Sequence, residues 1–185
     1  MTIGEPTAVV AGAGNEGQRR YYERLAGLGA CLVIVDEPGR WSESLVAGIA
    51  GTKWVATSIS GDPDVDAGAI LGALERSGVR ADGARTFFEN HGCEAARVAQ
   101  ALGLPGNPPE AVDAARSKVR TRAMSTRLGL PKPKAQRVRY LDELLAAAAG
   151  VGFPAVVKPE FGASAAGVVR VCSAAWRVDR EPGTV

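Results

Sequence analysis

Apolar residues in the first hundred positions form short runs that alternate with longer amphipathic segments. The runs are rich in valine and isoleucine and end in glycine or polar residues, which is typical of buried strands. The segments between them have helical spacing; in the first, Tyr21, Leu25 and Leu28 share one face and Gly29 ends the helix. This alternation predicts an α/β fold with a parallel sheet covered on both faces. The predicted strands are 7–11, 31–35, 53–57 and 85–88, and the predicted helices are about 18–28, 42–49, 70–78 and 93–102.

The pattern changes at a proline-rich stretch between residues 104 and 109. Such dense prolines forbid a continuous helix, so we place a domain boundary there, with a Rossmann-like domain over 1–107. Residues 108–172 predict a smaller, partial α+β domain, and 173–185 an irregular tail without helical or strand periodicity. The elements predicted for the smaller domain are a helix over 110–128, a strand over 135–138, a helix over 141–149, a strand over 155–157, a glycine-rich loop over 162–167 and a strand over 168–171.

The composition is that of an ordinary globular protein. The chain has 185 residues, of which 46% are hydrophobic, so it can bury a core, and its formal net charge of +2 says little about partners. It has neither a charged leader followed by an apolar core nor an apolar run near 18 residues. We therefore expect a soluble, cytoplasmic protein that has no membrane partner.

The cysteines and the single histidine give no sign of a metal site. Cys31, Cys93 and Cys172 are odd in number and far apart, which favours reduced thiols over disulfides or zinc ligands. His91 is the only histidine, and we expect it to pack or cap near the turn at 89–92. The sequence therefore predicts no metal ligand.

The first of two glycine-rich loops follows the first predicted strand. Residues 12–17 fit the pattern GxGxxG, and Asp36 stands at the end of the second strand, where a dinucleotide fold has its ribose-binding acid. This pattern makes an NAD(P)-dependent oxidoreductase an alternative function. However, Glu16 puts a negative charge where a pyrophosphate would approach, and a tight strand-to-helix turn explains the same glycines.

The second loop carries a stronger signal because a lysine precedes it. Lys158 ends the short strand over 155–157, Pro159 stops the ladder, and the small residues of 162–167 follow. An ammonium beside a loop with free backbone amides is a good phosphate site, since the charge and the directional donors act together. The alternative is a surface lysine beside an ordinary hairpin loop.

The charge distribution supports an anionic ligand. The stretch between Ala114 and Leu141 has nine basic residues and no acidic one, and Lys118 and Arg122 share a helix face. Apart from Tyr140 it lacks the aromatic residues of a single-strand nucleic-acid surface, so an anionic small molecule is favoured over nucleic acid. The nine are Arg116, Lys118, Arg120, Arg122, Arg127, Lys132, Lys134, Arg137 and Arg139.

In this order the pieces resemble the ATP-grasp superfamily. The family has an open α/β domain, a helix with a lysine (Lys118), a Gly-Leu-Pro turn (129–131), a strand ending in Val-Val-Lys-Pro (156–159) and a glycine-rich lid (162–167). The resemblance covers about residues 5–172. Within the superfamily the chain looks most like carnosine synthase and L-amino-acid ligases, and the segments that carry this likeness are 82–89, 102–108 and 115–122.

The resemblance implies a carboxylate–amine ligase that uses ATP and Mg²⁺ and forms an acyl phosphate before an amine attacks it. Its substrates would be small molecules, with amino acids expected. Lys118 and Lys158 would contact the ATP phosphates, Lys158 also near the adenine edge, and Gly162, Ser164 and Gly167 would form the lid. No catalytic residue is assigned.

The chain also departs from the family. Ser117 stands where relatives often have aspartate before the helix lysine, and after residue 172 the family continues with an acidic helix that this chain lacks. In the family the magnesium-binding acids and the arginine at the acyl phosphate come later. We therefore expect a truncated, inactive ligase fragment; a non-catalytic nucleotide-binding module is a further alternative. An unfinished domain exposes apolar surface, which predicts self-association as a homo-oligomer.

Overall fold

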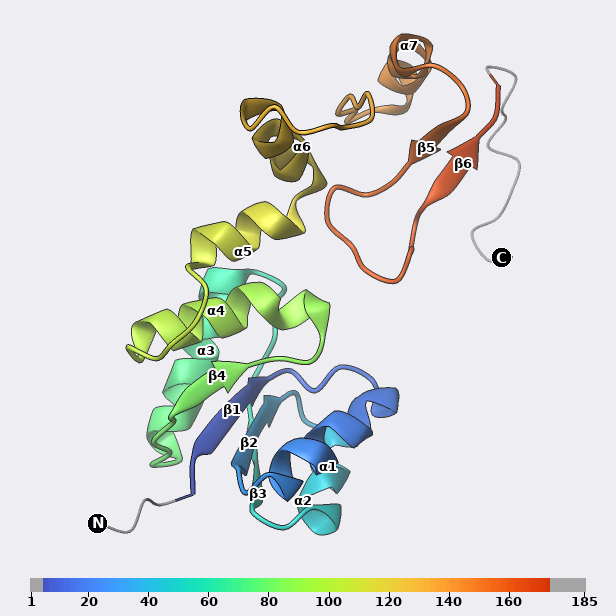
Figure 1. Cartoon of the computed structure of the whole chain (residues 1–185). Coiled ribbons are helices and arrows are strands. Elements are labelled where there is room, and N and C mark those ends of the chain that lie inside the picture. The colour runs from blue at the N-terminus through green and yellow to red at the C-terminus, as the bar shows by residue number, and fades with distance from the viewer. Residues whose placement is uncertain (1–4, 174–185) are drawn as a thin grey trace. The chain divides into compact units, whose positions relative to one another are not determined.

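The computed structural model describes residues 5–173 (Figure 1). The predicted irregular tail at 173–185 lies outside the described residues, apart from Ser173. The chain divides into two compact units, Met1–Asp113 and Ala114–Val185. The boundary placed at residue 107 from the sequence falls in the loop before helix α5 (Pro109–Arg116), and the domain assignment itself stays a prediction.

The first unit is built on one sheet of four parallel strands. Its order is β3-β2-β1-β4, so the chain moves outward from β1 to β3 and then returns to the other side of β1. This reversal puts a topological switch point at the carboxyl ends of β1 and β4, the usual ligand position in such sheets. The strands are β1 (Thr7–Ala11), β2 (Cys31–Asp36), β3 (Thr52–Ala56) and β4 (Gly83–Arg85).

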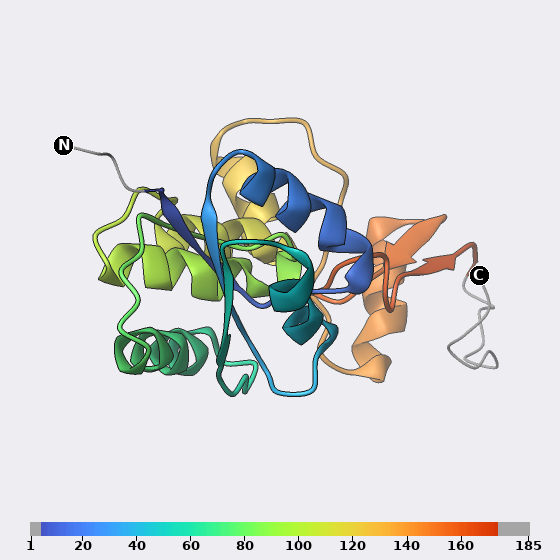
Figure 2. The same cartoon turned by 90° about the horizontal axis from the view of Figure 1, so that it is seen from below.

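Helices cover both faces of this sheet, as the alternating sequence pattern predicts. Figures 1 and 2 show α1 and α2 on one side of the strands and α3 and α4 on the other. Short 3₁₀ turns lead into several of them. The helices are α1 (Arg19–Gly27), α2 (Leu45–Gly48), α3 (Pro63–Arg76) and α4 (Gly92–Ala101), and the turns are η1 (Glu16–Gln18), η2 (Trp41–Ser44) and η3 (Glu89–His91).

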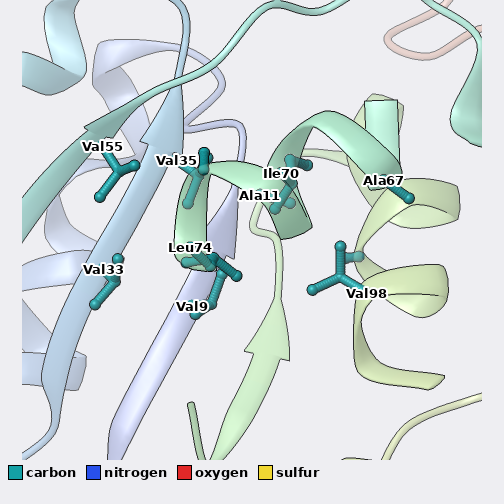
Figure 3. Close-up of a cluster of buried hydrophobic side chains, with 11 residues drawn as sticks. Val9, Ala11, Val33, Val35, Val55, Ala67, Ile70, Leu74 and Val98 are labelled. Atoms are coloured by element: carbon teal, nitrogen blue, oxygen red, sulfur yellow. The ribbon is translucent and has the colours of Figure 1, made fainter. Parts of the chain in front are cut away.

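Alternate residues of each strand enter two separate cores. Val9 and Val33 belong to one buried cluster with Ile70 and Leu74 of α3 and Val98 of α4, and Figure 3 shows Val9 beside Leu74. Their strand neighbours face the other way and pack against α1 and α2; this second cluster includes Val10, Leu32, Ile34, Tyr22 and Leu45. Each fully buried aliphatic side chain contributes about 1.5–3 kcal/mol, so these two layers hold the first unit together.

The predicted strand at 85–88 is displaced in the structure. Pairing with β1 stops at Arg85, and the following residues leave the sheet to pack over the end of β1. The Phe87 ring lies 5.1 Å from that of Tyr22 in an edge-on arrangement, and Phe88 lies beside His91. The aromatic residues extend the apolar run in the sequence, but their side chains are used for packing at the switch point.

The second unit is smaller and has little buried apolar surface. It contains α6 (Lys118–Arg127), α7 (Leu141–Val151) and an antiparallel pair of short strands, β5 (Ala155–Val157) and β6 (Val169–Val171), joined by the glycine-rich loop (Figure 1). The predicted strand at 135–138 is wrong: these residues have no strand partner, and only Val138 is even partly buried. Pro131 and Pro133 stand just before this segment, and because proline has no backbone N–H they cannot donate hydrogen bonds to a neighbouring strand.

The single helix predicted over 110–128 is also wrong, because Ser117 divides it. Ser117 has extended backbone angles (φ −82°, ψ 114°), and its hydroxyl accepts a hydrogen bond from the Arg120 amide. A serine in this position caps the helix that follows it. The apolar stripe runs through both α5 and α6, so periodicity alone predicts one continuous helix. No helix in the described part of the chain is both long and apolar enough to span a membrane.

Candidate functional site

The glycine loop after β1 is filled by side chains of the chain itself. Gly12 and Gly14 have positive φ angles of 62° and 69°. A Cβ atom on Gly12 would overlap the His91 ring, and one on Gly14 would lie 2.8 Å from Cβ of Phe88. The side chains of His91 and Phe88 therefore occupy the space beside these glycines. In a dinucleotide fold, a pyrophosphate would lie in that space.

The polar groups around this loop are satisfied internally. Asp36 is 2% exposed, and its carboxylate accepts hydrogen bonds from the Ala13 amide (3.2 Å), the Ser42 hydroxyl (2.8 Å) and the Glu37 amide (2.9 Å). Tyr22 donates to the Ala13 carbonyl at 2.9 Å, and burial, followed by the nearby Asp36 charge, raises the pKa of its phenol. Asp36 is thus a structural anchor for the loop, which does not favour the oxidoreductase alternative.

The second unit brings Lys118 to the glycine-rich loop. Lys118 is the first residue of α6, so its position is set by the Ser117 cap. Its backbone amide donates to the Glu160 carbonyl at 3.2 Å, and its ammonium donates to the carbonyls of Glu160 (3.3 Å) and Gly162 (3.4 Å). Two segments more than forty residues apart in sequence therefore meet at this lysine.

Lys158 lies at the end of β5 and is exposed. Strand alternation puts it on the same side as Val156, which is 57% exposed, while Ala155 and Val157 line an apolar hollow against α7. The Lys158 ammonium has no hydrogen bond or ion pair with any residue that the structure describes. It is therefore available for an anion, and Val156 supplies an apolar surface beside it.

The loop from 162 to 167 has several residues with left-handed backbone angles. Gly167 has a φ of 69°, and Ser164 and Ala165 also have positive φ angles, 55° and 59°. Left-handed conformations in non-glycine residues each cost about 1–2 kcal/mol, and such residues cluster at binding sites. The amides of Ala163, Ser164 and Ala165 donate to no acceptor among the described residues.

The charged and polar groups near this loop are of the kinds that bind phosphate. Ammonium groups on the flanking segments and loop amides without an acceptor in the described chain are the kinds of donor that bind phosphate oxygens. Lys118 and Gly162 are brought into contact, whereas Ser164 is exposed and its side chain has no hydrogen-bond partner among the described residues. No group of three or more His, Cys, Asp or Glu in the described part of the chain could hold a metal ion.

Sequence reasoning missed Glu160, which links the parts of this site. Its carboxylate accepts from the Ser117 hydroxyl at 2.7 Å and pairs with Arg137 at 2.9 Å. The only local signal is an acidic residue directly after the Lys-Pro pair. Its partner Ser117 is 43 residues away, so no local pattern predicts the contact.

Comparison with curated proteins finds an ATP-grasp enzyme and a carnosine synthase among the relatives. The chain is 30% identical over 154 residues to the ATP-grasp enzyme fsqD of Aspergillus fumigatus, which covers 82% of this chain and 26% of that protein. It is 35% identical over 106 residues to carnosine synthase 1 of Gallus gallus, covering 54% of this chain and 11% of that protein. No protein-family model matches.

Solved structures of an amino acid ligase and of a synthetase share the fold. The L-amino acid ligase of Bacillus licheniformis superposes with a TM-score of 0.71 at 23% identity, over 93% of this chain and 40% of that one. N5-carboxyaminoimidazole ribonucleotide synthetase of Thermus thermophilus gives 0.62 at 24% identity, over 90% and 41%. The chain thus spans about a quarter or less of these curated relatives and about two fifths of the solved chains. Together with the sequence matches, this places the chain among the ATP-grasp ligases, as their N-terminal portion.

Proposed function

We propose that this chain supplies the ATP-phosphate half-site of an ATP-grasp carboxylate–amine ligase. The observation that carries the proposal is the pair of lysines beside a loop with unused amides: the Lys118 ammonium lies against the loop carbonyls, and Lys158 is exposed without a partner in the described residues. Gly162 and Gly167 give the loop its turn, and Ser164 offers a hydroxyl at its tip.

The reaction proposed is amide formation between two small molecules. A carboxylate oxygen attacks the γ-phosphorus of ATP, ADP leaves, and the resulting acyl phosphate is attacked by an amine, which releases inorganic phosphate and a proton. Lys118 and Lys158 would neutralise charge on the phosphates while the loop amides fix their orientation. The names of carnosine synthase and L-amino acid ligase among the relatives support amino acids as substrates.

Magnesium bound to ATP would neutralise further phosphate charge, and no described residue is assigned to it. The matched segment is 40% of the Bacillus ligase chain, so we expect turnover to need residues that correspond to the rest of that length. These 185 residues alone are expected to bind MgATP without turnover. A cytoplasmic location and a homo-oligomer remain predictions.

The first test is a thermal-shift titration of the native chain with MgATP and, separately, with NAD. A ligand that binds only the folded state raises Tm, by the equivalent of about 2.7 kcal/mol at a hundred times its Kd. We expect MgATP to raise Tm and Lys158→Ala to abolish the shift. Lys134→Ala is the matched control, because this exposed lysine of the same unit has no described partner and lies away from the loop in sequence; its shift should persist.

A shift with NAD and none with MgATP would overturn the proposal and return the function to the loop at Gly12. A MgATP shift that survives Lys158→Ala would reject the site while leaving nucleotide binding in place.

A further inference from the structure

Glu160 contacts two separate segments of the second unit, one at Ser117 and Lys118 and the other at Arg137. Its carboxylate is shared between the Ser117 hydroxyl, through Oε1 at 2.7 Å, and the Arg137 guanidinium, through Oε2 at 2.9 Å. Its backbone carbonyl accepts from both the amide and the ammonium of Lys118. Glu160 also follows Lys158 by two residues and precedes Gly162 by two, so both candidate lysines and the loop are connected through it.

The contact with Ser117 fixes the start of α6. Ser117 is fully buried, and its hydroxyl accepts from the Arg120 amide while it donates to Glu160. Because the direction of a helix depends on its first turn, the Glu160 carboxylate orients the helix that carries Lys118. Loss of a helix cap costs about 1 kcal/mol in stability, but the larger effect expected here is on the position of the lysine.

Apolar packing does not fix this position. In the described part of the second unit, only Ala147 and Val171 are buried hydrophobic residues, and both lie with α7 and the strand pair. None of the residues of α6 is buried. Among the described residues, the connections of α6 to the loop are therefore polar: the contacts of Glu160 and the Lys118 hydrogen bond to the Gly162 carbonyl. Its negative charge also offsets repulsion among the surrounding basic residues.

We propose that Glu160 is a positioning residue for nucleotide phosphate: it holds Lys118, Lys158 and the glycine-rich loop in one arrangement and acts on the ligand through Lys118. This role rests on the proposed function. A displacement of about 1 Å in a charged binding group is enough to weaken its interaction with phosphate severalfold, so the effect belongs in the Kd for MgATP.

Isothermal titration of the full chain with MgATP tests this role. We expect Glu160→Ala to raise Kd about tenfold and Glu160→Gln to raise it less, because glutamine keeps an acceptor for Ser117 and loses only the charge that faces Arg137. Glu143→Gln is the matched control: this acid of the same unit accepts from the Arg139 backbone amide and has no contact with the loop, so Kd should stay unchanged.

A double-mutant cycle separates positioning from general stability. If Glu160 acts through Lys118, then Glu160→Gln should change Kd little once Lys118→Ala is present. If the two residues act independently, the fold-change in Kd of the double variant is the product of the two single fold-changes. Urea unfolding of each variant shows which of them fold, and Arg137→Ala, on the exposed side of the contact, provides a second variant that should also weaken binding. Equal Kd values for the native chain and Glu160→Ala, or independent effects in the cycle, would overturn the positioning role alone. A native chain that binds no MgATP would overturn it together with the proposed function.

Discussion

Single buried charged residues define several turns of the first unit, and Asp66 is the clearest. It is 1% exposed, and its carboxylate accepts from the amide and hydroxyl of Ser60, both at 2.7 Å, and from the Gly61 amide at 2.9 Å. Burial acts to raise the pKa of Asp66, but the hydrogen bonds from Ser60 and Gly61 outweigh it, so the pKa lies below its ordinary value. The carboxylate therefore fixes the turn that leads into α3.

Asp66→Asn should destabilise the first unit by about 2–4 kcal/mol at pH 7, because the asparagine amide faces the Gly61 N–H, a donor against a donor. Because folding lowers the pKa of Asp66, its carboxylate contributes its full stabilisation to the folded state above the ordinary aspartate pKa of about 3.9. This contribution is lost as the pH falls through the folded-state pKa. Urea unfolding followed between pH 7 and pH 3 measures the difference. Asp64→Asn, in an exposed ion pair with Arg97, should cost under about 1 kcal/mol. If the difference in unfolding free energy between the native chain and Asp66→Asn stays constant down to pH 3, then the ionised carboxylate is not the acceptor that stabilises this turn.

At the scale of elements, the two glycine-rich loops at 12–17 and 162–167 both begin and end with glycine, but their surroundings differ. The loop after β1 is closed by Phe88 and His91, which arrive from the segment after β4. The loop between β5 and β6 keeps unused amides and an exposed lysine at its start. The difference arises because the parallel sheet places β4 next to β1, whereas a two-stranded antiparallel pair has no third strand to cover its loop.

Gly12→Ala tests whether the first loop is a packing element. The φ of 62° costs an alanine about 1–2 kcal/mol and the overlap with His91 adds a similar amount, so we expect a loss of about 2–4 kcal/mol in urea unfolding. Adding His91→Ala to this variant should restore the part of the stability that is lost through the overlap with the His91 ring. Gly29→Ala is the control, because Gly29 has a φ of 84° but nothing within 4 Å of its Cβ position, so only the backbone term applies. Equal losses at Gly12 and Gly29 would show that His91 does not fill the loop.

At the scale of the whole molecule, buried apolar surface is distributed very unequally. Nearly all buried hydrophobic residues belong to the first unit, where they form the two layers on either side of the sheet. In the second unit, large apolar side chains such as Val156, Phe161 and Leu145 are more than half exposed. Local stability follows buried apolar contact, so the two units should not unfold as one.

Hydrogen exchange measured on the full chain should therefore resolve two levels of protection. Amides of β1, β2 and α3 are expected to exchange about 100-fold more slowly than those of α6 and α7. MgATP should then slow exchange in α6 and the loop at 162–167 and leave the sheet of the first unit unchanged. Uniform protection across both units would contradict this prediction.

Local sequence patterns were sufficient for the fold class and for the family. Alternation of apolar runs with amphipathic segments predicted the parallel sheet with helices on both faces, because strand and helix periodicities depend only on neighbours in the chain. Lys118, the Val-Val-Lys-Pro strand ending at Pro159 and the small residues of 162–167 carried the resemblance to ATP-grasp ligases, which the comparisons confirm. Their individual roles at the site stay predictions.

Other features were decided by contacts between distant residues. Asp36 and Gly12 looked like a dinucleotide site in the sequence, until the fold placed His91 on Gly12 and buried Asp36 under the loop. The break at Ser117 and the role of Glu160 depend on each other across 43 residues. Periodicity and spacing record which face of an element is apolar, but they do not record which distant side chain will occupy a turn or cap a helix. That information exists only once the chain is folded.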